Sequence, residues 1–162
     1  MAYLLDADIF IQAKNLHYGM DFCPAFWDWL IKSNSKEKLF SIEKVGDELQ
    51  AIEDNLSEWA KKRGANFFLK PDKSVLQSLV EVSRWVNEQD YEEGAKNVFL
   101  QKADYYLIAH AKSKKYTVVT HEKFADSKTK IKIPNVCIGL GIKCMTTYEM
   151  LRKERARFIL KP

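Results

Sequence analysis

Residues 1–10, MAYLLDADIF, contain the stretch that decides the fold. The apolar run at residues 3–5 stops at Asp6, a pattern that predicts a short buried strand with a carboxylate at its C-terminal end. In open α/β sheets, ligands bind at that end of the strands. A charge beside a buried strand must be paired, hydrated or bound to a metal. Asp6, with Asp8 two residues later, is therefore the first candidate for a functional site.

The composition indicates an ordinary globular protein. The chain has 162 residues, of which 46% are hydrophobic, so we expect a single domain over residues 1–162 with a real core. The apolar stretches are shorter than a membrane span and the N-terminus does not resemble a signal peptide, so we expect a cytoplasmic protein without a membrane partner. Three widely spaced cysteines fit neither a disulfide framework nor a zinc site, and we expect them to be small buried hydrophobes: Cys23, Cys137 and Cys144.

The charge balance favours an anionic partner. The net charge is +4, from 26 basic and 22 acidic residues. If several of the acids converge on one site, the rest of the surface is more basic than the total implies. Such a surface suits a polyanion.

Apolar residues that recur every three or four positions predict most of the chain to be helical. The predicted helices are a short one near residues 9–13, an aromatic one that carries Phe22, Phe26, Trp27, Trp29 and Leu30, a long one at about 43–62, one that carries Val75, Leu79, Val82 and Val86, one over 103–111, and a last one opened by a capping box at 146–149. The buried face of the long helix is predicted to be Val45, Leu49, Ile52, Leu56 and Trp59. The acidic segment 88–94 reads as a loop.

Short apolar or β-branched runs predict further strands at residues 39–42, 66–69, 116–120 and 135–138. The helix over 103–111 leads directly into the strand at 116–120. Such a crossover is right-handed, so this strand should run parallel to the first one and end at the same edge of the sheet. The chain is therefore an alternating α/β sequence, with Asp6 and Glu122 following two parallel strands.

Four acids follow strands or begin helices: Asp6, Glu48, Asp104 and Glu122. Taken singly, Glu48 fits a solvated helix glutamate and Asp104 fits a helix cap, while His110 fits a surface or core histidine. If the four acids meet, their mutual repulsion calls for a cation. Oxygen ligands without a His or Cys triad select Mg²⁺ or Mn²⁺, which activate water for attack on phosphorus. A phosphodiester would then be the natural substrate.

LLDADIF, the acid in VGDEL, ADYYLIAHA and VVTHE resemble, in this order, the four acidic motifs of the PIN domain. FCPAFWDWL and the IPNVC segment resemble more specifically the bacterial DUF4411 PIN-like, VapC-type toxin-like group. The resemblance covers nearly the whole chain. It implies a three-layer α/β/α fold with a central, mostly parallel sheet.

The same resemblance implies an enzyme, a Mg²⁺- or Mn²⁺-dependent endoribonuclease that hydrolyses RNA phosphodiester bonds. Asp6, Glu48, Asp104 and Glu122 would be its catalytic and metal-binding carboxylates, and the Thr120 hydroxyl would support them. Many such proteins are toxins of toxin–antitoxin pairs. We therefore expect a cognate antitoxin protein as a partner besides RNA, and a homodimer is compatible with the family.

Two positions depart from the PIN pattern. Asp8 stands where Asn or Ser is common, which adds negative charge and could alter the number of metal ions or form a hydrogen bond across the cleft. Glu122 stands where aspartate is commoner, and its longer side chain could reach an ion through water.

Two other functions remain open from the sequence. A catalytically silent PIN-like domain would bind RNA or protein without cleaving it. The strand followed by Asp6 and Asp8 also resembles haloacid-dehalogenase phosphatases, although Glu122 and Asp126 fit the later acidic pair of that family poorly.

Overall fold

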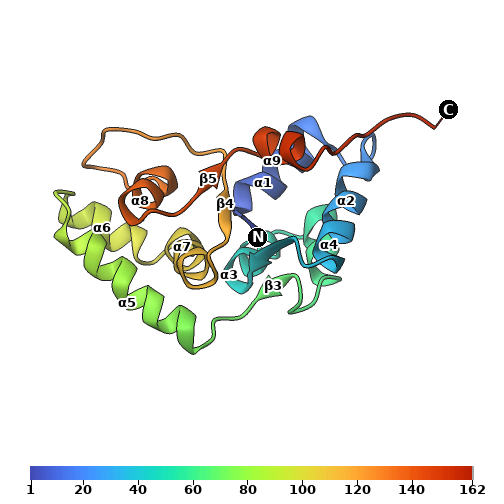
Figure 1. Ribbon diagram of the computed structural model, residues 1–162. Coiled ribbons are helices and arrows are strands. Elements are labelled where there is room, and N and C mark those ends of the chain that lie inside the picture. The colour runs from blue at the N-terminus through green and yellow to red at the C-terminus, as the bar shows by residue number, and fades with distance from the viewer. Residues whose placement is uncertain (162) are drawn as a thin grey trace.

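The computed structural model describes residues 1–161 and has a parallel five-stranded sheet at its centre (Figure 1). The strands lie in the order β3-β2-β1-β4-β5, and every neighbouring pair is parallel. Their bounds are Tyr3–Leu5 for β1, Leu39–Ile42 for β2, Phe68–Leu69 for β3, Thr117–Val119 for β4 and Cys144–Met145 for β5. The predicted first strand, Tyr3–Leu5, is therefore the central one, and it pairs on both sides.

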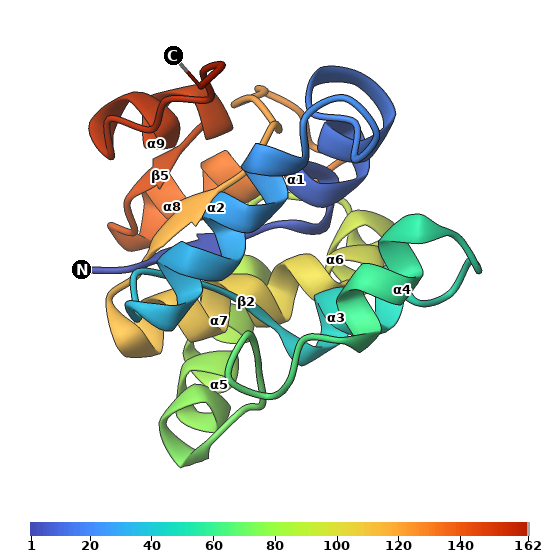
Figure 2. The same cartoon turned by 90° about the vertical axis from the view of Figure 1, so that its right-hand side faces the viewer.

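Helices cover both faces of this sheet. One face carries α5 to α8, and the other carries α1, α2, α4 and α9 (Figures 1 and 2). The bounds are Ala7–Gln12 for α1, Pro24–Ser35 for α2, Glu43–Leu49 for α3, Asn55–Lys61 for α4, Lys73–Glu88 for α5, Glu93–Phe99 for α6, Ala103–Lys114 for α7, Ile133–Leu140 for α8 and Thr147–Lys153 for α9. A π-helical turn, Ala13–His17, extends α1. The expected three-layer α/β/α fold is confirmed.

The core explains why β1 lies at the centre. Leu4 and Leu5 are completely buried, because strands covered by helices on both faces need apolar residues on both sides. Aromatic side chains fill the face under α2 and α4, where Phe10, Trp59 and Phe67 contact one another with ring centroids 5.4 to 6.1 Å apart. The aromatic residues of this region therefore serve mainly to pack the helices on the sheet.

The predicted strand at residues 135–138 is wrong, because this segment belongs to the helix α8. Pro134 occupies the first turn, where a missing N–H is harmless, and Gly141 ends the helix with a left-handed φ of 69°. An apolar run of this length does not distinguish a buried helix from a buried strand. The edge strand lies further along the chain, at Cys144–Met145.

The long helix predicted for residues 43–62 is also wrong, because the chain forms two helices there. Asp54 accepts a hydrogen bond from the Ser57 N–H at 2.8 Å, which caps a new helix start. Ile52, expected in the core, lies between the helices and is 72% exposed. The apolar residues keep a helix-like spacing through the break, so periodicity alone did not reveal it.

Three smaller expectations also change. The segment predicted as a loop at 88–94 ends in the first turn of α6, and Phe22 lies before α2 and is 66% exposed. Of the three cysteines only Cys137 is buried, while Cys23 and Cys144 are half-buried. Within residues 1–161, no helix combines the length and the apolar character needed to cross a bilayer.

Candidate functional site

The strand order places a crevice at the end of the central strand. The chain adds β2 and β3 on one side of β1, and then β4 and β5 on the other side. In open α/β sheets, such a reversal separates the connections that follow the two neighbouring strands and leaves a crevice at their C-terminal ends. Asp6 follows β1 and Thr120 follows β4 at this point, and the Asp6 N–H donates to the Val119 carbonyl at 3.0 Å.

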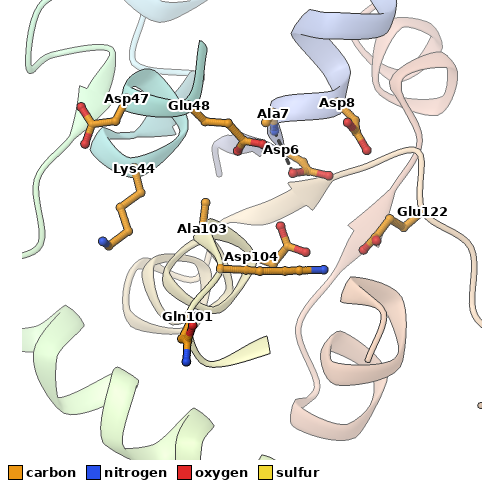
Figure 3. Close-up of a pocket in the computed structure, with 11 residues that line it drawn as sticks. Asp6, Ala7, Asp8, Lys44, Asp47, Glu48, Gln101, Ala103, Asp104 and Glu122 are labelled. Carbon is orange, nitrogen blue, oxygen red and sulfur yellow. Dashed lines mark hydrogen bonds between the residues drawn. The ribbon is translucent and has the colours of Figure 1, made fainter. Parts of the chain in front are cut away.

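A pocket of about 510 Å³ lies at this crevice (Figure 3). Six acidic residues line it: Asp6, Asp8, Asp47, Glu48, Asp104 and Glu122. Its other lining residues are Ala7, Lys44, Gln101, Lys102 and Ala103. The fold thus brings the four predicted acids to the wall of one pocket from four separate segments of the chain. Asp47 also contributes to the wall, but its carboxylate points away from the other acids in Figure 3.

Asp6 is the most buried of these acids, with 5% of its surface exposed. Its Oδ1 accepts a hydrogen bond from the Ala7 N–H at 2.7 Å, and its Oδ2 accepts one from the Thr120 hydroxyl at 2.9 Å. Burial, followed by the nearby negative charge of Asp104, holds the pKa of Asp6 well above its usual range. The carboxyl is therefore fixed in orientation and is unfavourable to ionise without a cation.

Asp104 lies in the first turn of α7, on the opposite wall from Asp6. Burial and the charge of Glu122 raise the pKa of Asp104 to about 6, even though the Lys102 ammonium lowers it. Glu48 in α3 is shifted in the same direction, since burial and the charge of Asp8 raise its pKa. The pKa is therefore raised in three of the four predicted acids, as expected for carboxylates that share a confined space.

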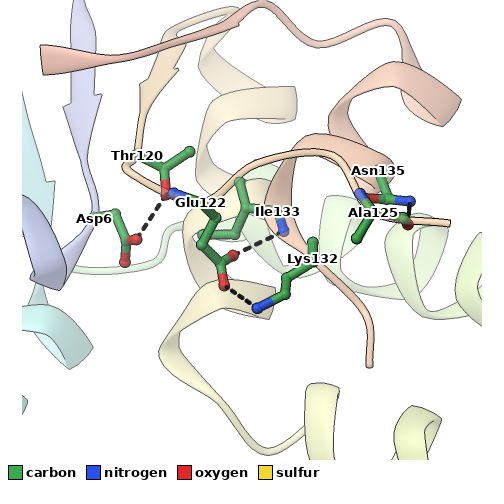
Figure 4. Close-up of polar contacts among 7 residues, drawn as sticks. All are labelled: Asp6, Thr120, Glu122, Ala125, Lys132, Ile133 and Asn135. Carbon is green, nitrogen blue, oxygen red and sulfur yellow. Dashed lines mark hydrogen bonds and ion pairs between the residues drawn. The ribbon is translucent and has the colours of Figure 1, made fainter. Parts of the chain in front are cut away.

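Glu122 differs from the other three because its carboxylate lies beside a cationic side chain (Figure 4). Oε1 accepts a hydrogen bond from the Ile133 N–H at 2.9 Å, at the N-terminus of α8. Oε2 lies 3.8 Å from the Lys132 ammonium. These contacts hold Glu122 at the rim, between the acidic pocket and the residues before α8.

Thr120 and Asp8 have distinct places around the site. The Thr120 hydroxyl donates to Asp6 and accepts from the Glu122 N–H at 3.1 Å, so it ties the ends of β1 and β4 together. Asp8 points into the pocket from α1, and its charge raises the pKa of both Asp6 and Glu48. Asp8 therefore belongs to the acidic wall itself.

Two lysines of the pocket, Lys44 and Lys102, are not among the site residues predicted from the sequence. Lys44 precedes Glu48 by one helical turn, and its ammonium lies 4.3 Å from the ring centroid of Tyr106. Lys102 directly precedes α7 and lowers the pKa of both Asp104 and Glu48. Its place two residues before the first-turn acid Asp104 was the available signal.

His110 is a core residue of α7, which is one of the two roles expected for it. It is 2% exposed, and among the described residues its Nδ1 has no hydrogen-bond partner. Burial lowers the pKa of His110 to about 4. His110 therefore stays neutral near pH 7 and takes no part in the acidic pocket.

The donor atoms of the pocket suit a hard divalent cation. They are carboxylate oxygens without a thiolate or imidazole, and Mg²⁺ and Mn²⁺ prefer such ligands. A bound cation would also stabilise the ionised forms of Asp6 and Asp104. As the side chains stand, however, no three His, Cys, Asp or Glu residues within 1–161 are arranged to hold a metal ion. The chemistry of the pocket fits such an ion, and binding would require the carboxylates to move toward one another.

Comparison with known proteins places the chain in a family. No curated protein and no solved structure matches it. Residues 3–158 match the family model of DUF4411, which is described as a domain of unknown function. The match includes the whole sheet and every residue that lines the acidic pocket. The protein therefore belongs to the DUF4411 family.

Proposed function

We propose that the protein is a Mg²⁺- or Mn²⁺-dependent endoribonuclease of the PIN-like type, with Asp6, Glu48, Asp104 and Glu122 as its metal-binding carboxylates. The observation that carries this proposal is the convergence of these four acids on one pocket at the C-terminal edge of a parallel sheet. Their resemblance to the acidic motifs of PIN domains supports the same assignment. A carboxylate cluster of this kind suits hydrolysis of a phosphodiester bond.

In this function, each residue of the pocket would have a role that follows from its position. Asp6 and Asp104, on facing walls, would hold the cation between them, while Glu48 and Glu122 would reach in from the rims. The cation, when bound, would neutralise the carboxylates and polarise the scissile phosphodiester. Thr120 would keep the Asp6 carboxylate oriented through its hydrogen bond to Oδ2. Lys102 would attract the phosphate toward the pocket.

Cleavage of a labelled, structured RNA pool tests this function. We expect products with Mg²⁺ or Mn²⁺, no products with EDTA, and a loss of activity of at least about a hundredfold in Asp6→Asn. Asp28→Asn is the matched control, because Asp28 is exposed on α2 and lies outside the acidic pocket. Cleavage that survives both EDTA and Asp6→Asn would contradict a metal-dependent nuclease at this site.

One observation favours a second function, a PIN-like domain that binds RNA or protein without cleaving it. Glu122 is already paired with Lys132 and the Ile133 N–H, and the four acids do not form a ready set of ligands. RNA binding without products in the same assay would indicate this function. Turnover of a small phosphomonoester would instead indicate a haloacid-dehalogenase-like phosphatase.

The proposed biological role is that of a toxin with a cognate antitoxin protein as its partner. This role rests on the PIN-like resemblance and on the nuclease proposal. Homodimer formation belongs to the same proposal.

A further inference from the structure

A second pocket opens directly beside the acidic one. It has a volume of about 520 Å³, and it shares Lys102 and Glu122 with the acidic pocket. Its walls are α6 on one side and the segment 129–132, which leads into α8, on the other. A chain that leaves the acidic pocket past Lys102 therefore enters this second pocket, which we call the α6 pocket.

Hydrogen bonds on both sides of the segment opposite α6 hold it in place. The Glu92 N–H donates to the Lys128 carbonyl at 2.9 Å, and Ile131 is 7% exposed. Asn135 donates to the Ala125 carbonyl at 2.7 Å and accepts from the Ala125 N–H at 3.1 Å (Figure 4). The α6 pocket is thus formed in advance of any ligand, which reduces the entropy lost on binding.

The charges of the α6 pocket favour an anion. Lys132 pairs with Glu122, whose carboxylate also accepts the Ile133 N–H, so the charge of Glu122 is already balanced. Lys102 and Lys130 are exposed and form no ion pair within residues 1–161. The one other acid of the lining is Glu92, at the start of α6. Two ammonium groups without an ion pair, those of Lys102 and Lys130, therefore line the α6 pocket.

Four of the other lining residues have apolar side chains. Ala95, Phe99 and Ile131 line the interior, and Val98 stands 55% exposed on the face of α6 that borders the pocket. Cationic groups around an apolar surface match a nucleotide, which has a phosphate at one end and a flat, largely apolar base at the other.

We propose that the α6 pocket binds the nucleotide of a single-stranded RNA that adjoins the scissile phosphodiester, with Lys102 and Lys130 on its phosphates and its base against Val98. This assignment rests on the proposed function and extends it, since it states which way the substrate strand leaves the acidic pocket. It also predicts a preference for single strands, because a base held in a duplex cannot reach the wall of α6.

Binding measured without cleavage tests the assignment. The probe is a fluorescent single-stranded RNA of about 12 nucleotides, titrated by anisotropy with the full chain in EDTA at about 50 mM salt. We expect Lys102→Gln and Lys130→Gln each to weaken binding about 3- to 10-fold and to reduce the slope of log affinity against log salt by about 0.7. Val98→Ser should weaken binding about threefold with an unchanged salt slope.

Two matched controls separate the pocket from general charge and apolar effects. Lys123→Gln removes an exposed lysine from the same loop, and Val80→Ser alters a valine of α5 that is 58% exposed; neither residue lines the α6 pocket. Both variants should bind within about twofold of the wild type. A duplex of the same sequence should bind more weakly than the single strand.

The outcomes distinguish this proposal from the nuclease proposal. Selective loss of binding in the Lys102, Lys130 and Val98 variants supports the α6 pocket, even if Mn²⁺ produces no cleavage and the nuclease proposal fails. Cleavage by the wild type, together with unchanged binding in these three variants, overturns the α6 pocket and leaves the nuclease. Equal losses in the controls, equal affinity for the duplex, or no binding by the wild type also overturn it.

Discussion

At the scale of single residues, burial and mutual repulsion destabilise the ionised carboxylates of the acidic pocket. Asp6 and Asp104 face each other across a space from which water is partly excluded, and burial raises the pKa of both. A carboxylate in a stabilising pair shows the opposite shift, as Asp54 does, where the Lys14 ammonium and the Ser57 N–H hold the pKa below its usual value. Raised carboxylate pKa values of this kind are typical of functional sites.

Asp104→Asn should therefore stabilise the protein while it removes the proposed nuclease activity. The pKa of Asp104 is about 6 in the fold, against 3.8 for an ordinary aspartate, so the folded state binds the proton more tightly than the unfolded chain. The charged side chain thus lowers the stability above pH 6, and this penalty disappears as the pH falls from 6 toward 4. We expect the variant to gain about 1–2 kcal/mol at pH 7.5 and almost nothing near pH 4.

Chemical denaturation of both proteins at the two pH values measures this difference. Asp104→Glu is a useful companion, because it keeps the charge and should show no comparable gain. A loss of stability in Asp104→Asn at pH 7.5 would mean that Asp104 acts mainly as a helix cap.

Thr120→Val tests whether the Thr120 hydroxyl orients Asp6, because the substitution hardly changes the volume of the side chain. The valine has nearly the same volume but lacks the hydroxyl that donates to Asp6 and accepts from the Glu122 N–H. We expect a loss of about 1–2 kcal/mol in the free energy of unfolding, because two buried polar groups lose a partner. RNA cleavage should fall as well, and Thr120→Ser should restore most of both. Wild-type cleavage in Thr120→Val would show that Asp6 needs no such support.

At the scale of helices and strands, the contact between α5 and α8 leaves no room for a larger side chain at Gly139. Gly139 of α8 lies against the Trp85 ring of α5, and a Cβ atom there would come within 2.0 Å of it. Gly139 therefore sets how closely α8 approaches α5. The position of α8 matters for the site, because its first N–H holds Glu122.

Gly139→Ala should destabilise the protein by about 1–3 kcal/mol, since the rigid indole must move or α8 must shift. Gly94→Ala in α6 is the matched control, because a Cβ there meets nothing within 4 Å. The control should be neutral or stabilising by about 0.5–1 kcal/mol, as expected for alanine in place of a helical glycine. Thermal melts of both variants provide the test, and equal melting temperatures would contradict the close packing of α5 and α8.

At the scale of the whole molecule, the residues that stabilise the fold lie apart from the residues of the candidate site. The covered strands and the aromatic cluster under α2 and α4 provide the core, and the acids gather at one edge of the sheet. The net charge of +4 is the balance of this acidic edge and a more basic remainder. Such a distribution guides a polyanion toward the molecule, while the carboxylates of the acidic pocket repel the scissile phosphate until a cation is bound.

If the toxin role is correct, expression of the protein alone should arrest bacterial growth, because uncontrolled RNA cleavage stops translation. Expression of Asp6→Asn at the same level should not arrest growth, and co-expression of a cognate antitoxin should relieve the arrest by the wild type. Colony counts together with immunoblots for protein level provide the measurement. Normal growth with verified nuclease activity would exclude the toxin role and leave the enzyme.

The sequence by itself determined the parts of the fold that depend on local pattern. Tyr3–Leu5 and Leu39–Ile42 are strands because short apolar runs leave few alternatives, and the helix from Ala103 follows from its spacing. The crossover from that helix into β4 made the parallel pairing of β1 and β4 predictable, because such connections are right-handed. From this pairing, the ends of both strands and their acids could be placed at the same edge.

Only the tertiary structure decided what depends on partners distant in the chain. The segment 133–140 is a helix that packs against α7 and α5, although its local pattern fits a strand equally well. The pairing of Glu122 with Lys132, the presence of Lys102 in the acidic pocket and the adjoining α6 pocket likewise depend on how α6, α7 and α8 come together. Periodicity reports which face of an element is buried, but it carries no information about which other element covers that face.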